Sequence, residues 1–442
     1  MSPSVNSPWL HRFAWLLATA TLALLALGGL VTSHGVGLAV PDWPNTYGYN
    51  LFLFPVSQWL GGILYEHTHR LMAVFVGLLT TILAAWMWLR ETRGRERWFA
   101  VGAIFLVLLL MGVRSLPVYI ALAGLALALV PFCLHQARRP SAGLRWWGLL
   151  AFAAVVLQGV LGGLRVVLLR DEIGIFHATL AQLFFVVVCA IVLFTSAWWQ
   201  NSRRLGAPEA KAPEDWRTPK ASPRAPASWT APVPWRFLPS TLDSRPSLVL
   251  SRALGLTALL VLVQLVLGAT MRHQHAGLAI PDFPLAYGKI WPAMDPASVA
   301  RYNQQRMEIT AVNPITAFQI RLQMTHRIVA VLILGAVAFC AWSARRQLGG
   351  KHPLSKLALV WLGLILAQAC LGATTIWSDK AADVATAHVL AGALSLALGA
   401  TITIISVPGF VSVRPASVAA SQVEPLSPAP FGAQPSVAAG LK

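Results

Sequence analysis

Long uncharged apolar runs are the feature that most restricts what this chain can fold into. A helix needs about 20 predominantly apolar residues to cross a membrane. Ten stretches come close to or exceed that length, namely residues 13–33, 64–89, 98–113, 117–136, 146–168, 173–198, 250–271, 316–344, 355–377 and 383–406. The sequence therefore predicts an all-α polytopic membrane protein with about ten transmembrane helices.

Composition and charge placement agree with this prediction. Hydrophobic residues make up 56% of the 442 residues and charged residues only 11%, less than half of the roughly 25% typical of soluble domains. The formal net charge of +18 comes mostly from Lys and Arg beside the apolar runs, where such residues orient helices in a bilayer. Nucleic-acid binding is therefore not expected. The richest basic segments lie on one side if both termini are cytoplasmic, which predicts a multi-pass protein of the inner (plasma) membrane.

An internal repeat divides the chain into two halves. Residues 28–48 read GGLVTSHGVGLAVPDWPNTYG, and residues 268–288 read GATMRHQHAGLAIPDFPLAYG, 240 positions later. Downstream matches occur at a spacing of 257 and then of 210, so the first half carries 47 extra residues. That length fits one helical hairpin, at about 98–136. The repeat predicts two four-helix bundles in the same orientation plus an inserted hairpin.

Two stretches rich in Pro and Ala separate or follow the repeats and lack the composition of a packed core. The predicted division is an N-terminal repeat with its hairpin, a cytoplasmic linker, a C-terminal repeat and a disordered tail, at residues 1–198, 199–249, 250–406 and 407–442.

Four of the eleven histidines lie inside apolar helices at repeat-matched positions: His69, His177, His326 and His388. Ionisable residues within a membrane are costly and are functional candidates by default. In the predicted topology each half places its two histidines at one depth on two helices. Such a pair can ligate a heme iron from opposite faces. A hydrogen bond across the bundle is the alternative, but the two-fold occurrence of a depth-matched pair favours two hemes.

One acidic residue distinguishes the halves. Glu66 precedes His69 by three residues and so shares its helix face, whereas the matching residue of the second half is Gln323. A carboxylate there could accept protons or stabilise positive charge on a substrate. An ion pair between Glu66 and Arg70 is an equally weighted alternative.

Arginines near the outer helix ends are candidates for binding heme propionates, with interfacial snorkelling as the alternative. The candidates are Arg70, Arg165 and Arg327. Asp42 and Asp282 lie in the Pro-Asp-aromatic-Pro loops, which we interpret as structured outer caps.

The combination of the GLAVPDWP loop, Glu66-His67-Thr68-His69-Arg70, the QGVLGG helix at 158–163 and a repeated half resembles the heme A synthase family. The resemblance covers most of residues 13–406. It implies an oxidoreductase acting on CH or CH2 groups, which converts a heme O ring methyl to the formyl group of heme A through a hydroxymethyl intermediate, for cytochrome oxidase assembly.

The resemblance also implies roles for particular residues. His69 and His177 would hold the iron of the substrate heme O, with Glu66 catalytic, and His326 and His388 would hold a heme b that accepts electrons. Candidate partners are a heme O synthase, an unidentified electron acceptor, the lipid bilayer and a second copy of the chain. The competing hypotheses are a diheme b-type electron carrier or quinol oxidoreductase, and a transporter.

Overall fold

The computed structural model describes residues 7–113, 115–139, 143–200, 246–305 and 314–407. Most of the predicted linker and nearly all of the predicted tail lie outside these residues. Across the described ranges the regular structure is helical, and nine helices are long and apolar enough to cross a membrane. The predicted all-α polytopic membrane fold is confirmed.

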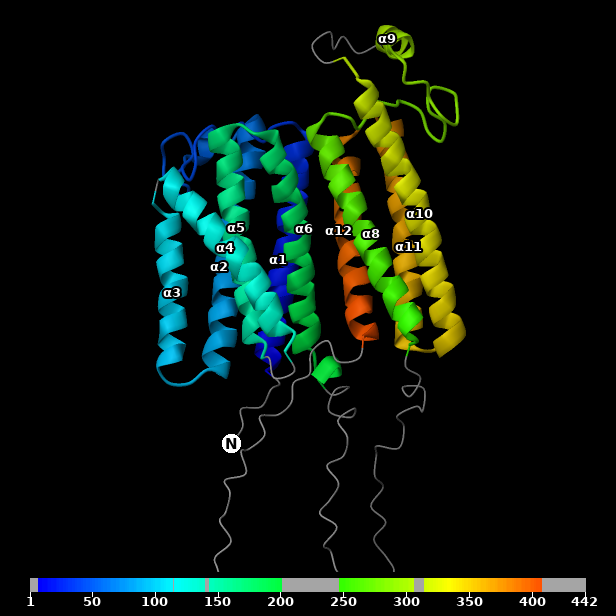
Figure 1. The fold of residues 1–442 in the computed structure, drawn as a ribbon. Helices are drawn as coiled ribbons and strands as arrows, with labels where there is room; N and C mark the ends of the chain where they lie inside the picture. Colours follow the sequence, from blue (N-terminus) through cyan, green and yellow to red (C-terminus); the bar gives the residue numbers. More distant parts are fainter. Residues whose placement is uncertain (1–6, 114, 140–142, 201–245, 306–313, 408–442) are drawn as a thin grey trace, which may run out of the picture.

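Eight of the helices form two neighbouring groups of four (Figure 1). The first group contains α1 (Pro8–Ser33), α2 (Gly61–Glu91), α5 (Arg145–Leu168) and α6 (Asp171–Thr195). The second group contains α8 (Leu248–His273), α10 (Ala317–Leu348), α11 (Pro353–Trp377) and α12 (Ala382–Ser406). We call these groups the N-terminal bundle and the C-terminal bundle.

Helices α3 (Arg95–Met111) and α4 (Leu116–Ala137) occupy the region of the predicted hairpin. They lie outside the N-terminal bundle, where α4 packs on α5 and α3 packs on α2. With 17 residues, α3 is the predicted span that is too short to count among the nine. Residue 114, between the two helices, is outside the described chain.

Helix ends differ from the hydropathy boundaries where capping groups extend a helix beyond its apolar run. Helix α1 begins at Pro8 rather than near residue 13, because the Ser7 side chain accepts a hydrogen bond from the Leu10 amide and proline suits the first turn. Helix α10 begins with a capping box between Thr316 and Gln319.

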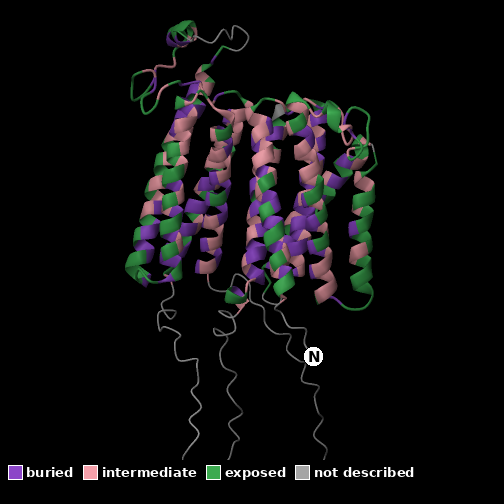
Figure 2. Cartoon of the chain, turned by 180° about the vertical axis from the view of Figure 1, so that it is seen from behind, coloured by how far each residue is buried: buried purple, intermediate pink, exposed green. Residues whose placement is uncertain are grey.

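The bundles pack against each other through α1 and α6 on one side and α8 and α12 on the other. A small apolar cluster containing Leu25, Phe185, Ala393 and Ala397 crosses this interface. Buried residues face the helix contacts, and exposed residues face outward (Figure 2).

The two ends of the molecule differ. The upper end in Figure 1 carries the loop after α1, with the short 3-10 helix Val56–Gln58, and the longer loop after α8, with α9 (Pro296–Gln305). Helix α1 begins and α12 ends at the lower end. Helices α2, α6, α10 and α12 therefore all begin at the upper end.

Candidate functional site

The four membrane histidines lie at similar depth near the upper end. Each is seven to ten residues into a helix that begins there: His69 in α2, His177 in α6, His326 in α10 and His388 in α12. At 1.5 Å per residue this is about two to three turns below the helix start. The imidazoles of His69 and His177 are close enough to interact electrostatically, and so are those of His326 and His388.

Each of these imidazoles lies against a glycine of the helix packed beside it. A Cβ atom at the glycine would lie 3.1 to 3.4 Å from the nearest ring atom, closer than almost all real Cβ contacts. The pairs are Gly28 with His69, Gly162 with His177, Gly268 with His326, and Gly372 with His388. A larger residue would require the imidazole to shift by a few tenths of an ångström, which gives Gly162 of the QGVLGG run and Gly372 of the QACLGA run a steric reason.

Three of the four histidines have their backbone carbonyl held by a glutamine. The side-chain Nε2 of the glutamine donates to the histidine carbonyl oxygen at 2.9 Å in each case: Gln158 to His177, Gln264 to His326, and Gln368 to His388. His69 has no such partner, because the position that matches Gln264 is Leu24. The sequence signal for this brace is the glutamine that recurs in the second pair of matched helices, Gln158 and Gln368, whereas Gln264 has no glutamine as its repeat mate.

These contacts fit a heme at each pair. The buried Nδ1 atoms of His177, His326 and His388 have no hydrogen-bond partner among the described residues, and imidazole nitrogens are the ligands that heme iron takes from helix bundles. The histidines that would hold the groups are those predicted from the sequence. A heme held there would supply one-electron redox chemistry.

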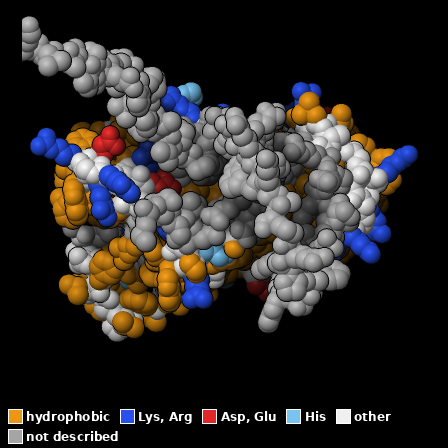
Figure 3. Space-filling view, turned by 90° about the horizontal axis from the view of Figure 1, so that it is seen from below, with side chains coloured by type: hydrophobic (Ala, Val, Ile, Leu, Met, Phe, Trp, Pro, Cys, Tyr) orange, Lys and Arg blue, Asp and Glu red, His pale blue; other side chains and the backbone are white. Residues whose placement is uncertain are grey.

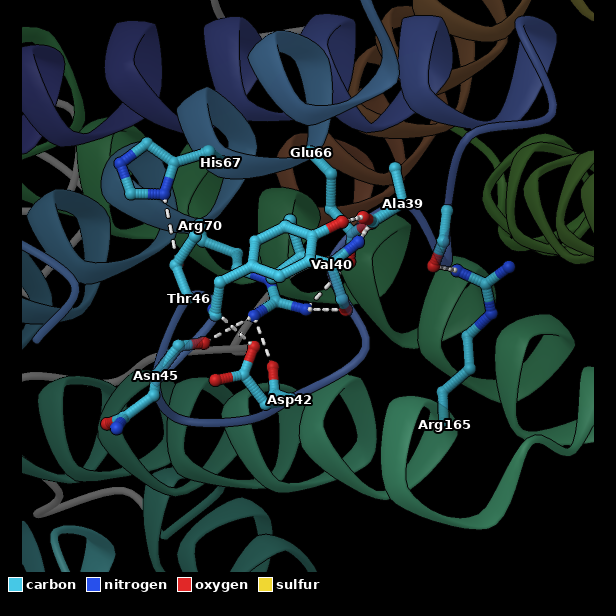
Figure 4. A network of polar contacts seen from close by, with 11 residues as sticks. Ala39, Val40, Asp42, Asn45, Thr46, Glu66, His67, Arg70 and Arg165 are labelled. Carbon is cyan, nitrogen blue, oxygen red and sulfur yellow. Dashed lines mark hydrogen bonds and ion pairs between the residues drawn. The ribbon is translucent and has the colours of Figure 1, made fainter. Parts of the chain in front are cut away.

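Glu66 is buried, with 4% of its surface exposed, and anchors the loop after α1 (Figure 4). Its Oε2 accepts a hydrogen bond from the Val40 amide at 2.8 Å, and its Oε1 forms an ion pair with Arg70 at 2.7 Å. Arg70 also donates to the carbonyl oxygens of Val40, Asp42 and Asn45. The ion-pair alternative for Glu66 therefore exists in the structure, within a larger clamp on the loop.

Gln323 makes the matching contact in the second half. Its Oε1 accepts from the Ile280 amide at 2.7 Å, as Glu66 accepts from Val40. Arg327 donates to the carbonyl oxygens of Asp282 and Leu285, at 2.7 and 2.9 Å. The negative charge of Glu66 is thus not required for holding the loop.

The two aspartates of the outer loops bind backbone amides rather than pointing at the histidines. Asp42 accepts from the amides of Tyr47 and Gly48, and Asp282 accepts from those of Tyr287 and Gly288, all at 2.7 to 2.9 Å. The turn needs positive φ at both residues of each Tyr-Gly pair. These contacts agree with the interpretation of the loops as structured caps.

The three arginines predicted to bind propionates differ in their free donors. Arg70 uses both terminal nitrogens on the loop and on Glu66. Arg327 also uses both on its loop. Arg165 makes one long hydrogen bond, 3.4 Å to the Gly37 carbonyl oxygen, and interacts electrostatically with both His69 and His177. Arg165 is the best placed of the three, and propionate binding stays a prediction for all of them.

Two partly buried residues between the bundles add to the site in a way that sequence reasoning missed. Arg272, at the end of α8, donates to the Gly29 carbonyl oxygen at 2.9 Å and to the Ser33 hydroxyl at 2.8 Å, both on α1. It also interacts electrostatically with His388. The neighbouring His273 lies against Gly174 on α6. The signal was present in the repeat, where Thr32 and Ser33 of the first half become Arg272 and His273.

His67 belongs to the outer cap and not to the histidine pairs. Its side chain is fully buried, its Nδ1 lies 3.0 Å from the Thr46 hydroxyl, and its ring contacts those of Phe54 and Trp59. Figure 4 shows it pointing toward Thr46 and away from Arg165.

Comparison with known proteins identifies the family. Three curated relatives, each named heme A synthase, come from Beijerinckia indica (31% identical over 28% of this chain and 32% of the relative), Shouchella clausii (32% over 22% and 32%) and Methylobacterium nodulans (32% over 32% and 38%). The matched stretches thus span about a third of each relative's length. The model of the COX15-CtaA family, described as cytochrome oxidase assembly protein, matches residues 111–400. The chain carries that family's sequence over most of its length, and it therefore belongs to the COX15-CtaA family of cytochrome oxidase assembly proteins.

Proposed function

We propose that this protein oxidises heme O to heme A. The single observation that supports the proposal most is that two depth-matched histidine pairs each lie against helical glycines, while a carboxylate accompanies only one pair. Two sites with the same surrounding residues would be expected in an electron carrier. Two sites that differ in a carboxylate are expected when one binds a substrate and the other transfers electrons. The three relatives named heme A synthase favour the same reaction.

In this proposal His69 and His177 hold the substrate heme O, and His326 and His388 hold a heme b. Conversion of the methyl group to a formyl group adds one oxygen atom from water and releases four protons and four electrons. A heme b held by His326 and His388 would supply the one-electron redox chemistry for this oxidation, with an external acceptor as the final oxidant. Arg165 interacts electrostatically with both histidines, which supports its proposed role in binding a propionate of the substrate.

Glu66 is proposed as the catalytic residue of the substrate site. Its carboxylate lies one turn above His69 on the same helix and is shielded from water. A fixed negative charge there stabilises positive charge that develops on the substrate. It can also take up a proton released from the methyl group if Arg70 moves aside. The amide of Gln323 can do neither, which fits a second site that only transfers electrons.

The test is a Glu66→Gln variant in a host that supplies heme O, followed by extraction of the bound porphyrins. Because Gln323 holds the matching loop with an amide, this variant should keep the fold and both hemes. Heme A formation should fall by at least about 100-fold, the loss typical of removing a positioned acid–base group. Gln323→Glu is the matched control and should leave product formation intact.

Three outcomes separate the hypotheses. Heme O or hydroxylated heme in the Glu66→Gln protein supports the proposed role, and normal heme A refutes it. Wild-type protein that contains heme b alone and forms no heme A in the heme O-supplying host would support the diheme electron carrier instead.

A further inference from the structure

A cavity of about 560 Å³ lies between α2, α3 and α5, at the lower end of the molecule and far from the histidine pairs. It contains the junction of the inserted hairpin with the N-terminal bundle. Its wall combines aromatic, basic and acidic side chains, those of Trp88, Arg95, Glu96, Phe99, Arg145 and Trp146. These side chains take no part in the histidine pairs or in the contacts by which Glu66 and Gln323 hold the outer loops.

Arg145 is held by aromatic rings in this cavity. Its guanidinium carbon lies 5.5 Å from the ring centre of Trp88 and 5.4 Å from that of Trp146, both within cation–π range. No carboxylate of the described residues forms an ion pair with it. The stacking fixes the direction of its N–H groups without using them.

Two buried donors of this wall have no acceptor among the described residues. They are the Nε–H of Arg145 and the indole Nε1–H of Trp88. A buried donor left without an acceptor costs about 1–3 kcal/mol, so a ligand whose acceptor atoms reached these two donors would recover part of that energy. Acceptor-rich anions such as phosphate match donors of this kind.

The carboxylate of Glu91, beside this wall, is already engaged with backbone amides. Glu91 ends α2, and its two oxygens accept from the amides of Leu144 and Arg145 at 2.8 and 3.0 Å. These bonds fix the start of α5 against the end of α2 and so position Arg145. Glu91 therefore builds the wall but does not supply the missing acceptor for the side-chain donors.

We propose that this cavity binds the headgroup of an anionic phospholipid of the phosphatidylglycerol class. The phosphate accepts from Arg145 and Trp88, and Arg95 adds a second positive charge. Glu96 accepts from the headgroup hydroxyls. Two arginines and one glutamate give the site a net charge of about +1, which matches one phosphate.

The position suits a lipid with its acyl chains in the membrane. The wall residues lie at the ends of α2, α3 and α5, where Trp and Arg meet the bilayer interface. Phe99 of the cavity wall is 82% exposed on α3, which offers an apolar surface beside the cavity for an acyl chain. Viewed from below, Lys, Arg, acidic and hydrophobic side chains gather at this side of the molecule (Figure 3).

An arginine stacked on a tryptophan at a helix end is not by itself a lipid site. Arg346 lies 5.3 Å from the Trp342 ring centre at the lower end of α10, but both side chains are exposed and neither lines the cavity. This pair differs from Arg145 in lacking the enclosed donors. Arg346→Gln is therefore a matched control.

The experiment uses the purified full-length protein in detergent micelles containing phosphatidylglycerol or phosphatidylcholine, with retained lipid counted by native mass spectrometry. The wild type should retain one phosphatidylglycerol in preference to phosphatidylcholine. Arg145→Gln should weaken that retention by about tenfold, and Trp88→Phe, which keeps the ring but removes the N–H, by a smaller factor. Arg346→Gln should leave it unchanged.

Equal retention of the two lipids, or equal loss in the Arg145 and Arg346 variants, would overturn the proposal. So would full displacement of the lipid by millimolar inorganic phosphate, because a free anion would then be the natural occupant. Circular dichroism checks that each variant is folded. If Arg145→Gln does not fold, Trp88→Phe and Arg95→Gln carry the same test.

Discussion

The two bundles hold their histidines with the same devices but surround them with different charges. Both use helical glycines beside the imidazoles and a clamp from α2 or α10 onto the preceding loop. The difference lies at three matched positions. Glu66 and Arg165 of the first half become Gln323 and Thr375, whereas Thr32 becomes Arg272. The shared devices would position the same kind of ligand in both bundles under the proposed function, and the unshared charges would then give the two sites different roles.

The charged residues lie at different places relative to the histidines in the two bundles. Arg165 interacts with both histidines of the N-terminal bundle, while Arg272 interacts with His388 of the C-terminal bundle from the interface between them. Among the described residues, the one buried carboxylate is that of Glu66, three residues before His69 in the N-terminal bundle. A protein that only moved electrons between two equal hemes would not need this asymmetry.

The largest expected effect comes from breaking one pair and leaving the other. His388→Ala should remove the heme b signal from the spectrum of the purified protein, and His177→Ala should remove bound heme O, because each heme would lose one of its two axial ligands. Pyridine hemochrome spectra and porphyrin extraction measure both.

His352→Ala is the control for this comparison. His352 is buried at the start of α11, where its Nδ1 accepts from the Leu354 amide, and it belongs to no pair. Its replacement should leave both signals in place. Loss of both hemes in either paired-histidine variant would show that the bundles do not bind independently.

The loop clamps test whether charge matters for the fold. Glu66→Ala leaves the Val40 amide without its acceptor and Arg70 without its ion-pair partner, and breaking a buried pair in this way costs about 3–5 kcal/mol. Gln323→Ala removes only neutral hydrogen bonds and should cost about 1–3 kcal/mol. Thermal unfolding in detergent compares the two. Equal losses would mean that the Glu66 charge adds nothing to the clamp.

A smaller effect is expected at the interface between the bundles. Arg272→Gln removes a partly buried positive charge near His388, which would stabilise the reduced form of a heme there. The midpoint potential of the proposed heme b should fall by about 70 mV, the shift that a unit charge about 10 Å away gives at an effective dielectric constant of about 20. Spectroelectrochemical titration measures it.

The control for Arg272 is its repeat mate. Thr32 donates to the Gly28 carbonyl oxygen within its own helix, so Thr32→Val should leave the potential unchanged. An unaltered potential in Arg272→Gln would show that the charge serves only to join α8 to α1.

The architecture could be predicted from the sequence because its causes are periodic and long. Apolar runs near 20 residues locate the helices, and a repeated loop of 21 residues locates the halves. The structure shows helix ends and a short polar helix that hydropathy does not predict. Helix α1 gains a turn because Ser7 caps it, and α9 forms within a polar loop.

The site could be predicted only as far as residue type implies a role. An ionisable residue in a membrane span is conspicuous, so the four histidines and Glu66 stand out. The braces by Gln158, Gln264 and Gln368 do not, because a glutamine in an apolar helix gives no hint of which carbonyl it binds. From the sequence, Arg272 is interpreted as a cation at the membrane interface. Its contact with Gly29 of the N-terminal bundle is visible only in the structure.

The smallest predicted effect tests the one device that the bundles do not share equally. Gln264 holds the carbonyl of His326, and its counterpart Leu24 leaves His69 without a brace. Gln264→Leu copies the first half into the second and should cost about 1 kcal/mol of stability, with a few-fold faster loss of heme b to a heme acceptor protein. The control is Leu262→Gln, which places a glutamine two residues away on a different side of α8. Under the proposed function the substrate heme would leave as product and the heme b would stay, so a less firmly held histidine is expected on the substrate side. If Gln264→Leu released heme b no faster than wild type, the glutamine would only pack α8 against α10.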